Sequence, residues 1–204
     1  MSKKFDNIEN YLVLYHKKVS YNWSMIILVG ASASGKTATA LKLQEKYHLT
    51  KAVTTTTREK RINEVDGVDY FYISRDEFLK RMKNNMFVET TTYNNNFYGC
   101  GKDQVKDDRI IVLDPNGFHA FEKLGDKHIV SFLILCDKSI REQRMISRGD
   151  KSEKIKQRLE NDIVDFAIDK IGKTDFTIDT TKMSIDEVAD EIYKKYQEKL
   201  LMVI

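Results

Sequence analysis

Cysteine is scarce in this sequence, and the chain has neither a long apolar run nor a large excess of charge of one sign. The two cysteines, Cys100 and Cys136, lie far apart and form no CxxC pair. Their spacing predicts neither a zinc site nor a disulfide framework, and it fits a protein of the reducing cytoplasm. No stretch approaches the ~18 apolar residues that a membrane-spanning helix needs, so no membrane partner is expected.

The charge balance gives no support to a nucleic-acid partner. The chain carries 34 lysine and arginine residues against 31 aspartate and glutamate residues, for a formal net charge of +3. Attraction for phosphate must then come from local clusters of cations. The N-terminus begins with Lys3 and Lys4 and continues with polar residues, which leaves no apolar signal-peptide core and argues against export.

One globular domain is expected from a composition that is 41% hydrophobic and 32% charged over 204 residues. Residues 1–24 stand apart, since apolar residues there follow helical spacing, namely Ile8, Tyr11, Leu12, Tyr15 and Val19. They predict an appended amphipathic helix. Alternatively Met25 is the natural start, because the domain predicted over residues 25–204 opens with a strand there. Both a monomer and a homodimer stay open.

The chain alternates between predicted strands and predicted helices. The run Met25–Val29 is apolar on both faces, which is typical of a buried parallel strand, and residues 110–113 and 130–135 are further strands. Three capping boxes mark helix starts: Ser74-x-x-Glu77, Ser139-x-x-Glu142 and Ser184-x-x-Glu187. This order predicts an α/β fold with a parallel central sheet flanked by helices.

A glycine-rich loop follows the first strand and leads into a helix-forming run. It satisfies the pattern GxxxxGK[ST] with Gly30, Ala31, Ser32, Ala33, Ser34, Gly35, Lys36 and Thr37. In such a loop the backbone N–H groups surround a phosphate, the lysine contacts the β and γ oxygens, and the hydroxyl of Thr37 holds Mg²⁺. A Gly-Ser turn could match by chance, but the strand–loop–helix order predicts an ATP or GTP site. The chain has no NKxD motif, which argues against a GTPase switch.

A second cluster of cations follows at residues 54–70. Arg58 and Arg61 lie three residues apart beside threonine hydroxyls, and Tyr70 adds a neutral donor. Guanidinium groups bind phosphate oxygens through paired charge-assisted hydrogen bonds, so the segment suits a phosphate dianion. The structural alternative is a solvated basic loop.

The pattern TTRxxRxxExxGxDY over residues 56–70, placed after a phosphate loop, resembles guanylate kinase. The resemblance covers most of the chain from Met25 onward. It continues through Phe87-Val88-Glu89, Phe97-Tyr98-Gly99-Cys100, Leu113-Asp114, Arg144-x-x-x-Arg148-Gly149 and Gln157-Arg158-Leu159. It implies a P-loop kinase with a small acceptor-binding lobe over residues 52–106, a helical lid over residues 139–167, and a core formed by residues 25–51, 107–138 and 168–204.

The resemblance also implies which residues bind GMP. Arg58, Arg61, Tyr70 and Tyr98 hold the acceptor phosphate, while Thr54, Glu89 and Cys100 read the guanine base. A carboxylate at Glu89 can accept from both N1–H and the N2 amino group of guanine, a pair that adenine lacks.

Two positions depart from the family pattern. Cys100 stands where serine or threonine is usual, and its thiol is a weaker donor. Asn116 stands where a second aspartate is usual, and it is retained as a candidate GMP-binding residue. Asp114 ends a predicted strand and is a candidate Mg²⁺ ligand through water. It is equally well explained as a turn-forming aspartate before the chain's one proline.

The charged segment over residues 139–167 resembles a kinase lid. It implies catalytic roles for Lys36 of the loop and for Arg144, Arg148 and Arg158, with Arg144 and Arg148 on one helical face before Gly149 breaks the helix. Without the phosphate loop, two solvent-facing helices joined by ion pairs would be the simpler interpretation.

The predicted reaction is phosphoryl transfer from ATP, with Mg²⁺, to GMP or dGMP. A kinase of the same fold acting on another nucleotide or on a phosphorylated sugar is the nearest alternative. A non-catalytic guanylate-kinase-like interaction module is a further alternative, against which the intact Lys36, Thr37 and lid arginines argue.

Overall fold

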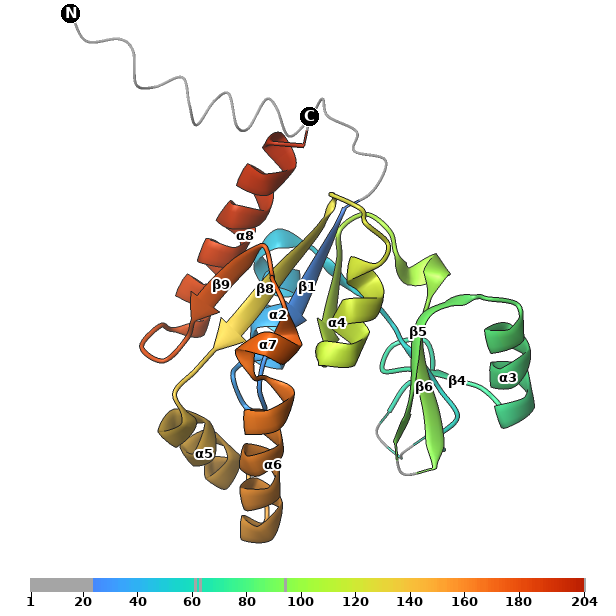
Figure 1. The fold of residues 1–204 in the computed structure, drawn as a ribbon, viewed down its shortest axis with the longest axis horizontal. Helices are drawn as coiled ribbons and strands as arrows, with labels where there is room; N and C mark the ends of the chain where they lie inside the picture. The colour runs from blue at the N-terminus through green and yellow to red at the C-terminus, as the bar shows by residue number, and fades with distance from the viewer. Residues whose placement is uncertain (1–23, 61, 63, 94, 204) are drawn as a thin grey trace, which may run out of the picture.

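The computed structural model describes residues 24–60, 62, 64–93 and 95–203 (Figure 1). The amphipathic helix predicted within residues 1–24 and the candidate phosphate ligand Arg61 therefore lie outside the described residues, apart from Ser24. Within the described part of the chain, no helix combines the length and the apolar character that a membrane crossing requires.

The larger sheet is five-stranded and parallel, in the order β2-β7-β1-β8-β9. Its strands are β1 (Met25–Val29), β2 (Thr50–Lys51), β7 (Arg109–Leu113), β8 (Ile129–Leu135) and β9 (Phe176–Asp179). The three strands predicted from apolar runs are confirmed as β1, β7 and β8, each within one residue. The parallel α/β fold is thereby confirmed.

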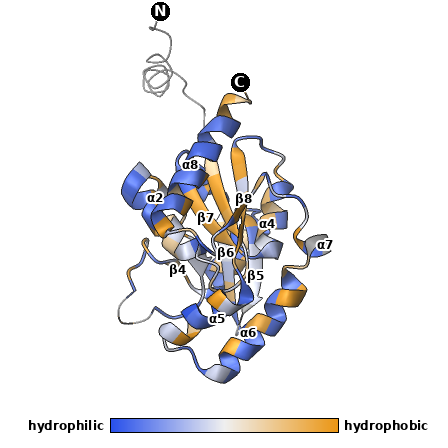
Figure 2. Cartoon of the chain, turned by 90° about the vertical axis from the view of Figure 1, so that its left-hand side faces the viewer, coloured by the Kyte–Doolittle hydropathy of each residue, from blue (hydrophilic) through white to orange (hydrophobic). Residues whose placement is uncertain are grey.

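Strand β1 lies in the middle of this sheet and contributes to both of its faces. Ile26 and Leu28 belong to a cluster with helices α2 (Lys36–Tyr47) and α8 (Ile185–Leu201). The alternate residues Met25, Ile27 and Val29 belong to a second cluster with α4 (Pro115–Glu122) and α7 (Ile168–Ile171). Figure 2 shows the apolar strands enclosed between helices. This double burial explains the uninterrupted apolar run of β1.

A smaller sheet in the order β4-β3-β6-β5 lies beside the first (Figure 1). It contains β3 (Thr55–Thr56), β4 (Phe71–Tyr72), β5 (Phe87–Tyr93) and β6 (Asn96–Gly101), and it is followed by the 3-10 turn η1 (Lys102–Gln104). Helix α3 (Arg75–Lys83) covers it through Phe78, whose ring stacks 4.5 Å from Phe87 and 5.3 Å from Phe97. These elements lie inside the range predicted for the acceptor-binding lobe.

Two helices, α5 (Lys138–Ser147) and α6 (Ser152–Asp165), form the segment predicted as the lid. Met145, Ile155 and Leu159 form a small apolar cluster between them, and Ala33 of the phosphate loop packs against this cluster. Gly149 separates the helices with a φ of +83°, a conformation that glycine adopts without strain.

The capping predictions have mixed outcomes. Ser184 and Glu187 form the complete box at the start of α8, and Ser74 accepts a hydrogen bond from the Glu77 N–H at the start of α3. The box predicted at Ser139 is wrong, because α5 begins at Lys138 and its N-cap is Asp137, two residues before Ser139. The Asp137 N–H donates to Thr181 Oγ1 at 3.0 Å, so a tertiary contact fixes this helix start.

Candidate active site

The phosphate loop joins the carboxyl end of β1 to the N-terminus of α2. A Cβ added at Gly30 would lie 2.3 Å from the carbonyl oxygen of Ile134, so the loop passes too close to β8 for any side chain at this position. The buried hydroxyl of Thr180, which follows the neighbouring strand β9, donates to the carbonyl of Ser34 at 2.9 Å. Contacts with β8 and with the end of β9 thus hold the loop in the strand–loop–helix arrangement that the sequence predicts.

Lys36 begins helix α2 and folds back over the loop. Its Nζ donates to the carbonyl oxygens of Gly30 (2.5 Å) and Ala31 (2.7 Å). Burial lowers the pKa of Lys36 to about 8, although the nearby carboxylate of Asp162 acts in the opposite direction. A nucleotide phosphate would supply the negative charge that this partly desolvated ammonium group lacks. Thr37 follows it and is exposed.

Arg58 lies in the smaller sheet's connecting segment, where aromatic and acidic side chains surround it. Its Nη2 donates to both carboxylate oxygens of Glu64, at 2.7 and 2.9 Å. Its guanidinium group lies 5.5 Å from the ring centre of Tyr70 and 5.7 Å from that of Tyr72, and Tyr72 donates its hydroxyl to Glu64 at 2.7 Å. The guanidinium group is therefore held in place by an internal anion and two rings.

Three further predicted GMP-binding residues lie in the same part of the smaller sheet as this arginine. The rings of Tyr70 and Tyr98 meet edge to face with centres 6.0 Å apart. Thr54 precedes β3, and its carbonyl accepts a hydrogen bond from the Phe71 N–H at 2.9 Å. The structure therefore brings Thr54, Tyr70 and Tyr98 to the same region of the smaller sheet as Arg58.

Glu89 and Cys100 are direct neighbours across β5 and β6. The Cys100 N–H donates to Glu89 Oε1 at 3.0 Å, and a register irregularity between Phe87 and Glu89 precedes this pair. Burial, with a smaller contribution from the carboxylate of Asp114, raises the pKa of Glu89 to about 7, although the hydrogen bond from Cys100 acts in the opposite direction. Two of the three predicted base-reading residues therefore lie together, and Asp114, directly after β7, lies close enough to influence Glu89.

Asp114 caps helix α4, and its carboxylate accepts a hydrogen bond from the Gly117 N–H at 2.8 Å. The turn-forming interpretation of this residue is therefore correct, and it does not exclude a second role because a carboxylate has further acceptor positions. Asn116 lies in the first turn of the same helix with an exposed side chain. Both residues lie at the carboxyl end of the large sheet, where open α/β sheets bind ligands.

The three lid arginines have different surroundings. Arg144 donates to the carbonyl of Ala33 at 3.2 Å, so it contacts the phosphate loop directly. Arg148 and Arg158 instead share Asp150, at 2.6 and 3.1 Å. Arg148 is the C-cap of α5, and its N–H donates to the Arg144 carbonyl at 3.3 Å, so the two arginines lie one helical turn apart although their guanidinium groups have different partners.

Comparison with known proteins identifies the family. The guanylate kinase family model matches residues 22–198 of the chain. The chain belongs to the guanylate kinase family. It is 31% identical to the guanylate kinase of Anaplasma phagocytophilum over 82% of this chain and 83% of that protein, and 31% identical to the guanylate kinase of Chlorobaculum tepidum over 82% and 91%. It also resembles the crystal structure of the Anaplasma phagocytophilum guanylate kinase, with a TM-score of 0.63 and 26% identity over 87% of this chain and 86% of that one.

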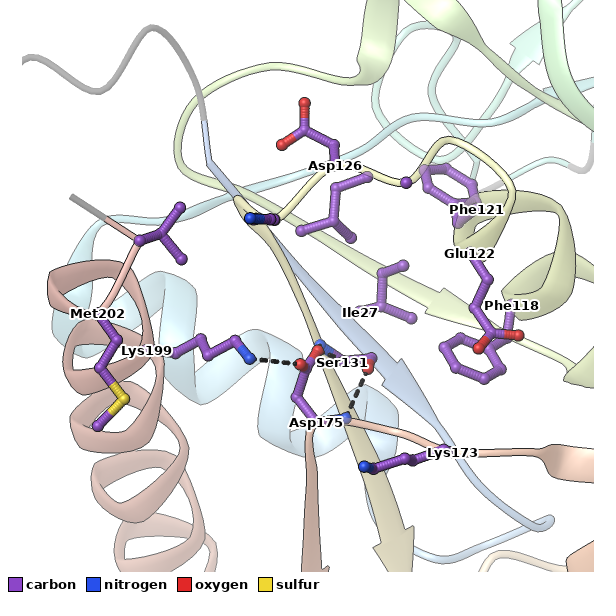
Figure 3. A pocket seen from close by; sticks show the side chains of 14 residues that line it. Ile27, Phe118, Phe121, Glu122, Asp126, Ser131, Lys173, Asp175, Lys199 and Met202 are labelled. Carbon is purple, nitrogen blue, oxygen red and sulfur yellow. Dashed lines mark hydrogen bonds and ion pairs between the residues drawn. The ribbon is translucent and has the colours of Figure 1, made fainter.

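A cavity of about 470 Å³ lies away from the candidate site, near the amino ends of β8 and β9 (Figure 3). None of the predicted site residues lines it. Asp175 accepts hydrogen bonds from the Ser131 N–H and hydroxyl at 2.9 Å each, and it pairs with Lys199 at 3.0 Å. These contacts tie β8, the start of β9 and α8 together, which is a structural role.

Four residues that the sequence patterns did not indicate contact predicted site residues, namely Glu64, Tyr72, Arg141 and Asp162. Glu64 belongs to the quoted motif, and an acid spaced six residues from Arg58 is a signal that could have indicated an internal partner. Arg141 and Asp162 give no such signal, because they lie 21 residues apart on two strongly charged helices.

Proposed function

We propose that this protein phosphorylates GMP or dGMP with ATP, giving GDP or dGDP and ADP. The observation that carries the proposal is the pairing of Glu89 with Cys100 across β5 and β6, near the charge of Asp114, in the same small sheet whose strand β3 pairs with β6 and leads to Arg58. This arrangement offers a place for a purine base, a phosphate and a triphosphate in sequence. The relatives named above bear the name guanylate kinase.

In the proposed reaction a phosphate oxygen of GMP attacks the γ-phosphorus of ATP, the bond to the β-γ bridging oxygen breaks, and ADP leaves. No covalent enzyme intermediate is needed, since the acceptor phosphate is itself the nucleophile. Lys36 and the backbone N–H groups of the loop bind the donor phosphates. Arg144 of α5 contacts the same loop at the Ala33 carbonyl. Arg148 and Arg158 would leave Asp150 to bind the transferring group.

Thr37 and Asp114 would hold Mg²⁺. Both offer hard oxygen donors, and no cluster of three or more histidine, cysteine, aspartate or glutamate side chains suited to a metal occurs in the described part of the chain. That donor set fits Mg²⁺, which binds through few protein ligands and completes its shell with phosphate oxygens and water. The bound ion would neutralise charge on the donor phosphates.

The base is read by Glu89 in this proposal. Its carboxylate accepts from N1–H and the N2 amino group of guanine, while Thr54 and Cys100 line the same region. Nucleotides are the proposed partners, not nucleic acid or a membrane. The proposed location is the cytoplasm, in keeping with the unpaired cysteines.

The deciding experiment is a coupled assay of ADP release with ATP, Mg²⁺ and a panel of acceptors. GMP and dGMP should give the highest kcat/KM, with AMP, CMP, UMP and phosphorylated sugars far behind. If another acceptor gave a higher kcat/KM than GMP and dGMP, that acceptor would be the substrate. The absence of turnover with every acceptor, together with no ATP binding in calorimetry, would instead indicate a non-catalytic interaction module.

A further inference from the structure

The phosphate loop already holds an anion, and that anion belongs to the chain itself. Asp162 extends from helix α6 to the rim of the loop, where the Ser32 N–H donates to both of its carboxylate oxygens at 3.1 Å each. The Ser32 hydroxyl donates to Oδ1 at 3.1 Å as well. A loop amide and a loop hydroxyl thus bind a carboxylate in the way that they would bind a phosphate oxygen.

A buried arginine completes the surroundings of this carboxylate. Arg141, on helix α5, donates to Asp162 Oδ2 at 2.5 Å and to the Ser32 carbonyl at 3.2 Å. Both charged residues have a relative exposure of only 7%. Such a pair loses much hydration free energy on burial, so it gives little net stability unless the remaining polar atoms are satisfied.

Some buried polar atoms in and around this ion pair have no hydrogen-bond partner. Among the residues that the structure describes, Arg141 Nε and Ser34 Oγ are buried and have no hydrogen-bond partner. Both border the phosphate loop, and buried donors of this kind are rare because a buried polar group without a hydrogen bond loses its hydration and gains nothing in return. A ligand with more acceptor oxygens than a carboxylate would satisfy more of them.

We propose that Arg141 is a further binding residue for the donor phosphates, and that Asp162 is an internal anion which occupies its place until ATP displaces it. The inference rests on the proposed function for the identity of the donor. In the ATP complex Arg141 and the Ser32 amide exchange the Asp162 carboxylate for phosphate oxygens. The displaced carboxylate then moves toward solvent, away from the like charge of the triphosphate.

Two opposite effects on ATP affinity follow. Because Asp162 competes with the phosphates, D162N should bind ATP more tightly than the unchanged protein, by about fivefold or more. Because Arg141 contacts the phosphates, R141L should bind ATP more weakly by a similar factor, and the unpaired Asp162 adds repulsion. For a variant with both substitutions, the affinity for ATP should be lower than that of D162N alone by a factor of about five or more.

Calorimetric titration with ATP and Mg²⁺, and separately with GMP, tests the proposal on the full chain. The matched control is D165N, which removes the same charge from an exposed position of the same helix. D165N should leave both affinities unchanged, and GMP affinity should stay constant in all four variants. If D162N does not fold, comparing the double variant with R141L isolates removal of the carboxylate, and the double variant should bind ATP more tightly.

The proposed displacement of Asp162 by ATP is overturned if D162N binds ATP no more tightly than the unchanged protein. It is equally overturned if the double variant binds ATP no more tightly than R141L. The role of Arg141 is overturned if the double variant binds ATP as tightly as D162N. Since both deciding comparisons use ATP affinity, a failure of GMP as the acceptor would overturn the proposed function without altering their results.

Discussion

Glu89 Oε1 accepts a hydrogen bond from the Cys100 backbone N–H at 3.0 Å, across the two antiparallel strands β5 and β6. This bond fixes one carboxylate oxygen by a contact that no side-chain substitution at Cys100 removes. It also opposes the effect of burial on the carboxyl group, whose pKa nevertheless stands at about 7. The orientation of the proposed guanine-reading group is therefore set by the backbone.

Replacing Glu89 with glutamine should weaken GMP binding selectively. The amide keeps one acceptor but turns a donor toward the donors of guanine, which costs about 1–3 kcal/mol, or roughly 5- to 150-fold in affinity. Calorimetry with GMP and with ATP measures both effects, and ATP affinity should not change. An equal loss for the two nucleotides would remove Glu89 from the base site.

The affinity for GMP should depend on pH near neutrality. In the free protein the pKa of Glu89 is raised to about 7, and the ionised form is the one that accepts from guanine. The Kd for GMP should therefore rise as the pH falls below about 7, approaching tenfold per pH unit.

The GMP phosphate itself titrates near pH 6, so the E89Q variant serves as the control. It keeps the phosphate titration and lacks the carboxyl group. The difference between the two pH profiles should show a single ionisation near 7, and superimposable profiles would contradict the assignment.

Replacing Cys100 with serine should increase the selectivity for GMP over AMP. Burial raises the pKa of the Cys100 thiol to about 12, so it stays protonated at neutral pH and acts as a weak donor. A hydroxyl is a stronger donor, and the expected gain is about tenfold in the ratio of kcat/KM for GMP over AMP. Cys136→Ser, at the end of β8, is the matched control and should leave the ratio unchanged. A lower ratio in C100S would show that the thiol does not face the base.

Replacing Lys36 with methionine should remove turnover while GMP still binds. The ammonium group is the cation nearest the loop carbonyls, at 2.5 and 2.7 Å, and its loss should lower kcat by about a hundredfold or more. The coupled assay measures kcat, and calorimetry with GMP is the control for folding. Turnover that survives the substitution would contradict the proposed phosphoryl transfer at this loop.

The sequence predicts the central features of the fold because local signals agree with tertiary packing. The apolar run Met25–Val29 is buried on both faces, and the phosphate loop lies between it and α2 as its pattern requires. The start of α5 is the exception. Ser139 and Glu142 have the spacing of a capping box, but the contact between Asp137 and Thr181, which are 44 residues apart, determines where the helix begins.

Apart from Glu64, whose spacing from Arg58 is a signal, the internal partners of the site arginines could not be predicted in the same way. Arg58 pairs with Glu64, Arg158 with Asp150, and Arg141 with Asp162. Each acid is one of 31 in the chain, and charge spacing does not show which of them faces a phosphate site. When no phosphate is bound, an arginine of such a site is stabilised by a nearby carboxylate of the same chain.

Strand β1 contributes alternate side chains to the two main apolar clusters, and its last residue leads into the phosphate loop. Neither helical layer can detach without exposing this strand, so its amide protons should exchange with solvent only when the whole domain unfolds. The loop is thus anchored to the part of the molecule that opens least often. We therefore expect any motion that admits nucleotides to come from α5, α6 and the smaller sheet, while the loop stays in place.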